Sequence, residues 1–278
     1  PIIDSEKRKH FRILTADAQR GIQLQGCEAA LIVTESKELL DAIDRLEQDY
    51  DLPRGVQSRR NPALCKSPYL ASGLSPKNVD KHIAYCKKCG FTMMTLYYEA
   101  FFKCKMYDSC GNYDEQDIRE SYPEGFESLR QMLQKIKAAG ITPGLHFLHT
   151  HIGLKSRYVT PVADHRLNKT RIFTLARPLG KDDTTVYVDQ DPTGATMSER
   201  CRILQFGGEL IHYEGYTTQR PYCFTGCKRG DWDTIVTEHP QGQMGGLLDV
   251  SEYAANSCYI DQNTDLQDEI AEKLARVY

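Results

Sequence analysis

The sequence predicts an α/β fold, a parallel (β/α) barrel or partial barrel, that carries an inserted small all-β domain. Up to residue 157, short apolar runs alternate with stretches of helical periodicity, which is typical of parallel βα units. Residues 158–247 change to short strands, and helical periodicity returns at 265–277. We therefore divide the chain into 1–157 for the first part of the barrel, 158–247 for an inserted β module, and 248–278 for the return to the barrel.

The first predicted unit is a strand followed by a helix. The strand covers 29–33 (AALIV), a short β-rich apolar run. The helix follows a capping residue, Ser36, and its apolar side chains recur at helical spacing: Leu39, Leu40, Ile43 and Leu46. A further helix is predicted to begin at Ser75-Pro76 and to end at Gly90, because a capping hydroxyl before proline favours helix starts and glycine favours helix ends.

Two strands with one helix between them come next. The segment 91–98 (FTMMTLYY) lacks clean alternation, as expected for a strand covered on both faces. The helix begins at 121–123 and ends at Gly140, and one apolar face is formed by Phe126, Leu129, Leu133 and Ile136. The segment 141–148 (ITPGLHFL) is the second strand. Strands joined in this way predict right-handed parallel units whose carboxyl ends open to the same edge.

The middle of the chain is predicted to be a module of short strands. These strands cover 184–188, 201–206 and 209–213, and Gly207-Gly208 is a two-residue hairpin loop. Gly245-Gly246 is interpreted as a further turn. The module precedes the last predicted helix, so we expect it to be an insertion after a barrel strand. Such loops lie at the carboxyl face, where barrels carry their active sites.

The composition excludes two classes of protein. Lys and Arg number 35 against 38 Asp and Glu, which gives a net charge of −3, and the basic residues are scattered. We therefore expect no nucleic-acid partner, because such proteins usually show a clustered basic face. With a mean hydropathy of −0.52 and no apolar run approaching ~18 residues, we also expect no membrane-spanning segment.

The cysteine content favours a secreted protein. Ten cysteines are many for this length, their number is even, and Asn168-Lys169-Thr170 is a glycosylation sequon. We expect an extracellular glycoprotein, modified at Asn168, in which most cysteines form disulfides and Cys104 and Cys110 take part. No leader follows Pro1, so either a leader was removed or the sequence starts inside a longer product.

We predict no metal and no cofactor. Cys86 and Cys89 with Cys104 and Cys110 could form a zinc cluster, but the second spacing is too long and the first pair closes a helix. Disulfides or buried thiols fit these four better. No glycine-rich loop with a phosphate-binding lysine occurs, so a nucleotide cofactor has no support.

Glu99 is the candidate catalytic residue. It follows directly on the strand 91–98, and the last residues of that strand, Tyr97 and Tyr98, are candidates for substrate binding. Aromatic rings pack on the apolar faces of sugars, while a carboxyl group binds hydroxyls or transfers protons. The alternative is that Glu99 is a solvated loop residue and that both tyrosines belong to the core.

Three of the 8 histidines gather at the end of the strand 141–148: His146, His149 and His151. Imidazole donates hydrogen bonds, carries protons and binds metals, so all three are candidates for substrate binding. For His146 the alternative is a hydrogen-bonded core residue, because it alternates with Gly144 and Leu148.

One βα unit resembles that of barrel glycoside hydrolases of the α-galactosidase type. Its helix opens with 122–126 (YPEGF) and ends with 137–140 (KAAG), and its strand begins with 141–146 (ITPGLH). Leu52-Pro53, Gly90-Phe91 and 264–271 (TDLQDEIA) are similar to microbial relatives that carry an inserted β module.

The predicted β module is itself similar to small β domains of phage tail proteins. The matching pieces are 208–211 (GELI), Tyr213, Gly215, 224–230 (FTGCKRG) and His239. The whole resemblance spans 29–278.

The resemblance implies a carbohydrate substrate. In such enzymes the nucleophilic aspartate ends a strand that comes after the last helix predicted here, and the predicted βα units fall short of eight. We therefore expect a glycoside hydrolase-like protein, acting on a poly- or oligosaccharide, whose carboxylates lie partly outside this chain. The alternative is a non-catalytic secreted structural or glycan-binding protein on a degenerate hydrolase barrel, so enzymatic activity stays open. Self-assembly or other domains of a longer chain are further expected partners.

Overall fold

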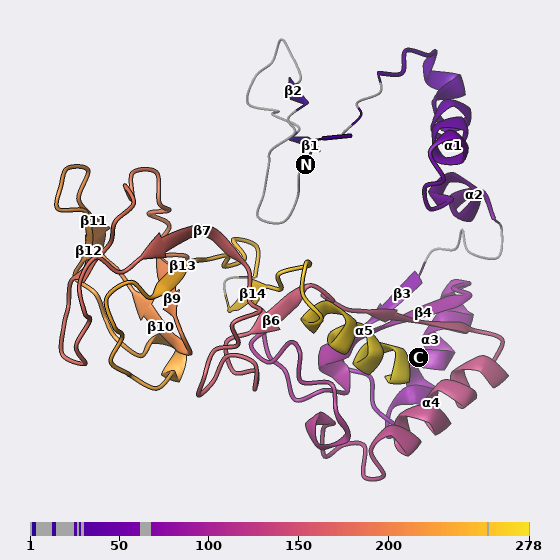
Figure 1. Cartoon of the computed structure of the whole chain (residues 1–278). Coiled ribbons are helices and arrows are strands. Elements are labelled where there is room, and N and C mark those ends of the chain that lie inside the picture. Colours follow the sequence, from indigo (N-terminus) through magenta and orange to yellow (C-terminus); the bar gives the residue numbers. More distant parts are fainter. Residues whose placement is uncertain are drawn as a thin grey trace. The chain divides into compact units, whose positions relative to one another are not determined.

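The computed structural model describes residues 2–3, 13–14, 25–26, 28, 31–61, 68–254 and 256–277, and the chain divides into two compact units, 1–66 and 67–278. In the first unit, β1 (Ile2–Ile3) pairs with β2 (Ile13–Leu14) in antiparallel fashion. The 3-10 turn η1 (Ser36–Glu38) then leads into α1 (Leu39–Asp49) and α2 (Gly55–Arg60), as Figure 1 shows. The boundary near residue 66 was not predicted from the sequence.

The strand predicted at 29–33 is wrong where it can be assessed. Residues 31–35 have no regular secondary structure, and Leu31 and Val33 are 91% and 89% exposed. Ala29 and Ala30 lie outside the described residues. An apolar run becomes a strand only when another strand pairs with it, and none of the described strands pairs with this one. The helix predicted after it is confirmed as α1.

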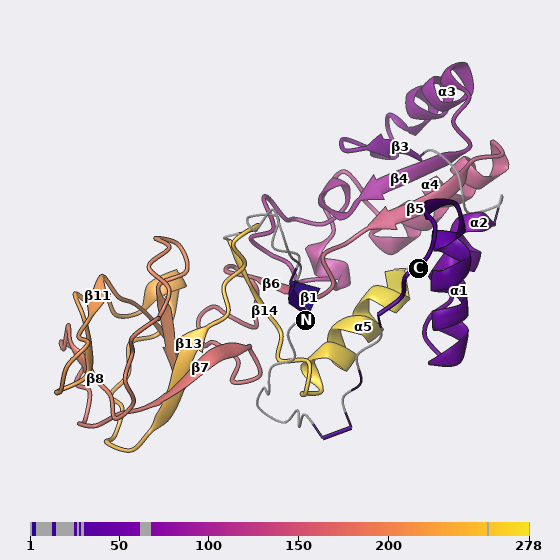
Figure 2. The ribbon, with the colours of Figure 1, turned by 90° about the horizontal axis from the view of Figure 1, so that it is seen from above.

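The second unit contains a three-stranded parallel sheet in the order β3-β4-β5, formed by β3 (Pro68–Ala71), β4 (Met93–Tyr97) and β5 (Thr142–His146). The crossovers contain α3 (Val79–Cys89) and α4 (Phe126–Ala138), and the three strands lie side by side in Figure 2. The predicted parallel α/β arrangement is therefore confirmed. The described strands form an open sheet and not a closed barrel.

The helices pack on this sheet through the apolar stripes that the sequence indicated. One continuous core joins α3, α4 and the sheet with α5 (Leu266–Val277), and its members include Val79, Ile83, Met94, Leu96, Leu129, Ile136, Leu266 and Ile270. Gly90 ends α3 in the left-handed conformation, at a φ of 75°. The helix begins at Val79, later than predicted, because Asn78 Oδ1 accepts the Ser75 N–H at 2.8 Å and holds a turn there.

A two-stranded antiparallel sheet forms the connection to the β module. β6 (His151–Gly153) follows β5 closely, and β14 (Ser257–Tyr259) pairs with it after the chain has passed through the module. We call this pair the neck. It places the chain segments that enter and leave the β module next to each other.

The β module has two antiparallel sheets. One has the order β10-β9-β13-β7, with β7 (Lys169–Thr174), β9 (Ile203–Phe206), β10 (Glu209–His212) and β13 (Met244–Leu248). The other has the order β11-β12-β8, with β8 (Val186–Tyr187), β11 (Gly215–Tyr216) and β12 (Cys223–Thr225). Between them lies a separate core that includes Phe173, Val186, Leu204, Phe206, Ile211, Tyr213, Phe224 and Leu247. The 3-10 turn η4 (Asp231–Asp233) lies beside β10.

The two glycine pairs of the module have different structures. Gly207-Gly208 joins β9 to β10 as the predicted hairpin loop, with Phe206 opposite Glu209. Gly245-Gly246 is not a turn but lies inside β13. A Cβ on Gly245 would stand 2.3 Å from the Gln205 carbonyl oxygen and from the Phe206 ring. These glycines therefore allow neighbouring groups to approach the strand closely.

The cysteines differ from the expectation of disulfides. Eight of the ten lie in the described residues, all eight are free thiols, and seven are buried. Cys27 and Cys65 lie outside the described residues. Cys104 and Cys110 are buried beneath Tyr98, whose hydroxyl oxygen lies 3.1 Å from Cys110 Sγ and 3.8 Å from Cys104 Sγ. These thiols fill the core as small apolar groups do.

Within the described ranges, none of the helices has the length and apolar character needed to cross a membrane.

A buried ionic network holds the β module together. The Glu209 side chain has no exposed surface, and its carboxylate accepts N–H groups of Arg229 at 2.7 and 2.8 Å. The backbone N–H groups of Gly230 and Thr237 donate at 3.1 Å, and His239 Nε2 lies 2.8 Å from Oε2. Burial raises the pKa of Glu209, but the hydrogen bonds from His239 and Arg229 outweigh it and hold the pKa at about 2.

We predict that Glu209→Gln destabilises the protein by about 3–5 kcal/mol at neutral pH, because the buried Arg229 guanidinium loses its counter-charge. The stabilisation belongs to the ionised carboxylate, so it is complete above a pH of about 4.5 and is lost as the pH falls towards 2. Urea unfolding followed by the fluorescence of the single tryptophan, Trp232 in η4, measures the effect. Glu238→Gln, an exposed carboxylate in the same module, is the control. Equal stability of the two variants would refute the prediction.

Candidate functional site

Two of the predicted site residues meet at the carboxyl edge of the parallel sheet. The register of β4 and β5 pairs Tyr97 with His146, and their rings stack at 4.4 Å with an interplanar angle of 12°. Both side chains are half-buried. The stack follows from the predicted adjacency of consecutive parallel strands, which brings their last residues together.

The stack continues into a row of aromatic rings. The hydroxyl groups of Tyr97 and Tyr107 lie 3.1 Å apart, and the Tyr107 ring is 6.1 Å from that of Tyr253. We call His146, Tyr97, Tyr107 and Tyr253 the aromatic row. The hydrogen bond with Tyr97, together with burial, raises the pKa of the Tyr107 hydroxyl, so this group stays protonated at neutral pH.

Glu99 forms a hydrogen bond with the backbone of Tyr107, a member of the aromatic row. It lies in η2 (Tyr98–Ala100), directly after β4, and its Oε1 accepts the Tyr107 backbone N–H at 3.2 Å. Its carbonyl oxygen accepts the Arg119 Nε–H at 2.7 Å. Met106 and Tyr107 both have positive φ angles, 49° and 67°, which non-glycine residues rarely adopt. Glu99 therefore holds a strained turn in place and leaves its second carboxylate oxygen, Oε2, for another partner.

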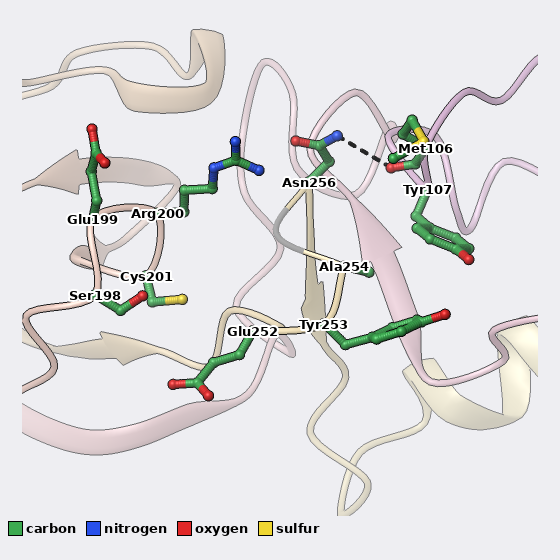
Figure 3. A pocket seen from close by; sticks show the side chains of 10 residues that line it. All are labelled: Met106, Tyr107, Ser198, Glu199, Arg200, Cys201, Glu252, Tyr253, Ala254 and Asn256. Carbon is green, nitrogen blue, oxygen red and sulfur yellow. Dashed lines mark hydrogen bonds between the residues drawn. The ribbon is translucent and has the colours of Figure 1, made fainter.

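A cleft of about 350 Å³ opens beside the aromatic row. In Figure 3, Met106 and Tyr107 lie on one side and residues 198–201 on the other, and the segment between them contributes Glu252, Tyr253, Ala254 and Asn256. The charged and polar side chains that line it are Glu199, Arg200, Glu252, Ser198 and Asn256. The Asn256 Nδ2–H donates to the Met106 carbonyl oxygen at 3.2 Å, which ties the middle segment to the strained turn.

The sequence did not indicate most of this cleft. Tyr107, Tyr253 and the cleft carboxylates lie in loops without periodicity, and they come together only because the chain returns from the β module. The sequence features that lie nearest to Tyr107 are Cys104 and Cys110, which flank it in the loop after the strand 91–98.

Tyr98 corrects the sequence-based assignment. Its side chain has no exposed surface, and its hydroxyl group bonds to Cys110 inside the core. Tyr98 lies in η2 (Tyr98–Ala100), past the end of β4, and although its ring stacks 6.1 Å from that of Tyr97, only Tyr97 is partly exposed. A ligand at the aromatic row cannot reach Tyr98, so we leave it out of the candidate site.

The three predicted histidines do not form one cluster. His149 is exposed in the turn after β5, whereas His151 is buried in the neck, 3.2 Å from Ser251 Oγ through Nε2. The His151 ring also packs on Tyr259 at 4.6 Å. Burial lowers the pKa of His151, and the nearby His149 lowers it further. His146 alone belongs to the aromatic row, where its Nδ1 is buried without a hydrogen-bond partner.

The sequon residue Asn168 is half-buried at the base of β7. Its Nδ2–H donates to Asp249 Oδ2 at 2.8 Å, and its backbone N–H donates to the Tyr259 carbonyl oxygen at 2.9 Å. A glycan on Nδ2 would compete with the bond to Asp249, a carboxyl group whose pKa burial raises. Glycosylation at Asn168 stays a prediction.

Among the residues that the structure describes, no three His, Cys, Asp or Glu side chains gather in a way that could hold a metal ion. Cys86, Cys89, Cys104 and Cys110 therefore do not form the zinc cluster considered above.

The chain has a distant likeness to known structures. No protein-family model matches the sequence, and no curated protein matches it. Among solved structures, the trehalose-6-phosphate hydrolase of Bacillus licheniformis is similar over 76% of this chain, with 12% identity and a TM-score of 0.37. The match covers 32% of that protein, so this chain spans about a third of its length. The likeness is to a glycoside hydrolase and bears neither on the α-galactosidase type nor on a phage-tail origin of the β module.

We predict that acidification destabilises the folded protein through His151. Its folded-state pKa lies below the ordinary value of 6.5, so the unfolded chain binds the proton more readily and stability falls as the pH drops through about 6.5. Unfolding free energies measured between pH 7.5 and 5.5 should fall less steeply in His151→Gln than in the wild type. His165→Gln, at an exposed position, is the control. Parallel pH profiles for the wild type and His151→Gln would contradict the prediction.

Proposed function

We propose that this protein is carbohydrate-active and that an oligosaccharide binds in the cleft beside Tyr107 and Tyr253. The observation that carries the proposal is the exposed Tyr253 ring, 79% accessible, next to Tyr107 at the edge of a 350 Å³ cleft lined by carboxylates. An aromatic face left in water is favourable to cover, and a sugar ring offers an apolar face that fits it.

The polar lining supports a sugar over other ligands. Glu199, Glu252 and Asn256 supply hydrogen-bond acceptors for hydroxyl groups, while Arg200 and Asn256 supply donors. The two carboxylates outnumber the single guanidinium, which disfavours a polyanion such as nucleic acid. The volume lies in the range of about 300–1,000 Å³ that is usual for small-molecule sites.

Hydrolysis of a glycosidic bond is the second candidate function. Glycoside hydrolysis needs two carboxyl groups that flank the bond. Glu199 and Glu252 line the cleft itself, and Glu99 accepts the backbone N–H of Tyr107, which is one of the lining residues. We keep the expectation that part of the catalytic machinery lies outside this chain.

An extracellular location is likewise a proposal. Its support is the sequon at Asn168, because the eight cysteines that the structure describes are free thiols. Self-assembly and further domains of a longer chain stay proposals of the same kind.

We predict that Tyr253→Ala weakens oligosaccharide binding about three- to tenfold, because an aromatic stacking contact contributes about 0.5–1.5 kcal/mol. Affinity electrophoresis in gels that contain soluble starch, xylan or galactomannan identifies the glycan, and titration calorimetry with its oligomers gives the affinity. Tyr50→Ala, which removes an exposed tyrosine in the first unit, is the control. Failure of the wild type to bind any of these glycans, or equal binding by the two variants, would reject the proposed site.

We predict that Glu99→Gln separates the two candidate functions. If Glu99 transfers a proton or attacks the sugar, the variant loses at least about 100-fold in turnover while it still binds the glycan. If the protein only binds, the wild type releases no reducing sugar, and the variant binds as well as the wild type. Reducing-sugar release and calorimetry on the same preparations measure both. Glu238→Gln is the charge-matched control. An active wild type with a fully active Glu99→Gln would exclude Glu99 from the reaction.

A further inference from the structure

A second hollow, of about 450 Å³, lies in the β module and is independent of the cleft described above. It is lined by residues of β8, of the loop that joins β11 to β12, and of the segment after β7. Two backbone hydrogen bonds fix its floor. The Ala176 N–H donates to the Tyr187 carbonyl oxygen at 2.9 Å, and the Val188 N–H donates to the Tyr222 carbonyl oxygen at 3.0 Å. The three segments are therefore held in register.

Each wall of this hollow carries an arginine packed on a tyrosine. The Arg177 guanidinium carbon lies 4.1 Å from the centre of the Tyr187 ring, and that of Arg220 lies 5.5 Å from the centre of the Tyr222 ring. In such a cation–π contact the positive charge lies over the face of the ring. The contact does not require the five N–H donors of the guanidinium to bond to the ring, so they can bind a ligand.

These two guanidinium groups have no acidic partner among the residues that the structure describes. Arg229 and Arg202 of the same module, by contrast, are paired with Glu209 and Glu214. Arg177 and Arg220 are both exposed, so their donors face solvent. The tyrosine contacts restrict the side chains before a ligand arrives, which lowers the entropy cost of binding.

The hollow also contains one acidic group, Asp189, which follows β8. Its backbone N–H donates to the Thr174 carbonyl oxygen at 3.0 Å. The lining therefore carries two positive charges and one negative charge. A compact multivalent anion would be repelled by Asp189, whereas a ligand that carries both anionic groups and hydroxyl groups satisfies all three charged residues.

We propose that this hollow is a binding site for an anionic saccharide, whose carboxylate or sulfate groups bind Arg177 and Arg220 and whose hydroxyl groups bind Asp189. Guanidinium forks match planar carboxylates and sulfate oxygens in bidentate geometry. The volume of about 450 Å³ exceeds that of a single inorganic anion and lies in the usual range for small-molecule sites. The β module would thus select charged glycans, whereas the first cleft has an acidic lining.

The test is titration calorimetry of the full chain at low ionic strength with three hexasaccharides: a heparin-derived one, an oligogalacturonate and the neutral maltohexaose. We expect binding of at least one charged ligand, weakened by added salt, and a loss of about three- to tenfold in affinity for each of Arg177→Gln and Arg220→Gln. The heparin and galacturonate arms distinguish sulfate from carboxylate as the group recognised. Arg177→Lys keeps the charge but loses the fork, so we expect an intermediate affinity.

Lys181→Gln is the matched control, because it removes one positive charge from the same module outside the hollow. Both arginines are exposed, so thermal unfolding of the variants should match that of the wild type. The proposal is overturned if neither charged hexasaccharide binds, if Lys181→Gln weakens binding as much as Arg177→Gln, or if maltohexaose binds equally well. Tyr253→Ala should leave this binding unchanged, so the two sites are tested separately.

Discussion

The β module depends on one buried ion pair, between Glu209 of β10 and Arg229 in the turn before η4. A fully buried carboxylate costs several kcal/mol unless its oxygens are completely hydrogen-bonded. Here the donors come from Arg229 itself and from Gly230, Thr237 and His239, so satisfying one carboxylate fixes the path of the chain over the segment that links β12 to β13. The only helix or strand in that link is η4. Hydrogen bonds to the Glu209 side chain therefore hold this segment in place, as backbone hydrogen bonds between strands do in a sheet.

The first cleft follows from the way in which the chain enters and leaves this module. Residues 252–256 come just before β14, and 198–201 come just before β9, whereas Met106 and Tyr107 belong to the loop after β4. The loop after β4 supplies one wall, and the segments before β9 and before β14 supply the others. Glu99 links the sheet to this loop, because it lies in η2 directly after β4 and its carboxylate accepts the backbone N–H of Tyr107, a residue with a positive φ. None of the residues that line the cleft belongs to the parallel strands, although the loop that carries Met106 and Tyr107 leaves the sheet at its carboxyl edge.

Local sequence patterns predicted the three amphipathic helices of the second unit. They could not predict which residues far apart in the sequence come into contact. The helices Val79–Cys89, Phe126–Ala138 and Leu266–Val277 each carry an apolar stripe, and a stripe records burial within a few turns of chain. The run FTMMTLYY does not alternate between polar and apolar residues. It therefore does not reveal that Tyr98 and Leu96 are buried whereas Tyr97 is only half-buried. Gly245 lies in a strand because the Phe206 ring occupies the space of its missing side chain, which no local pattern records. The loops that complete the cleft have no periodicity at all.

The neck has a consequence for the order in which the protein folds. His151 pairs with Tyr259, and more than 100 residues separate β6 from β14 along the chain. Closing so long a loop in a disordered chain costs more entropy than closing a short one. Once the β module has formed, the Asp249 N–H donates to the Asn168 carbonyl oxygen at 2.9 Å, so the residues that flank the first and last strands of the module already lie side by side. The folded module then holds residues 168 and 249 together. Only the short segments between these residues and the two strands remain to be ordered before β6 and β14 can pair.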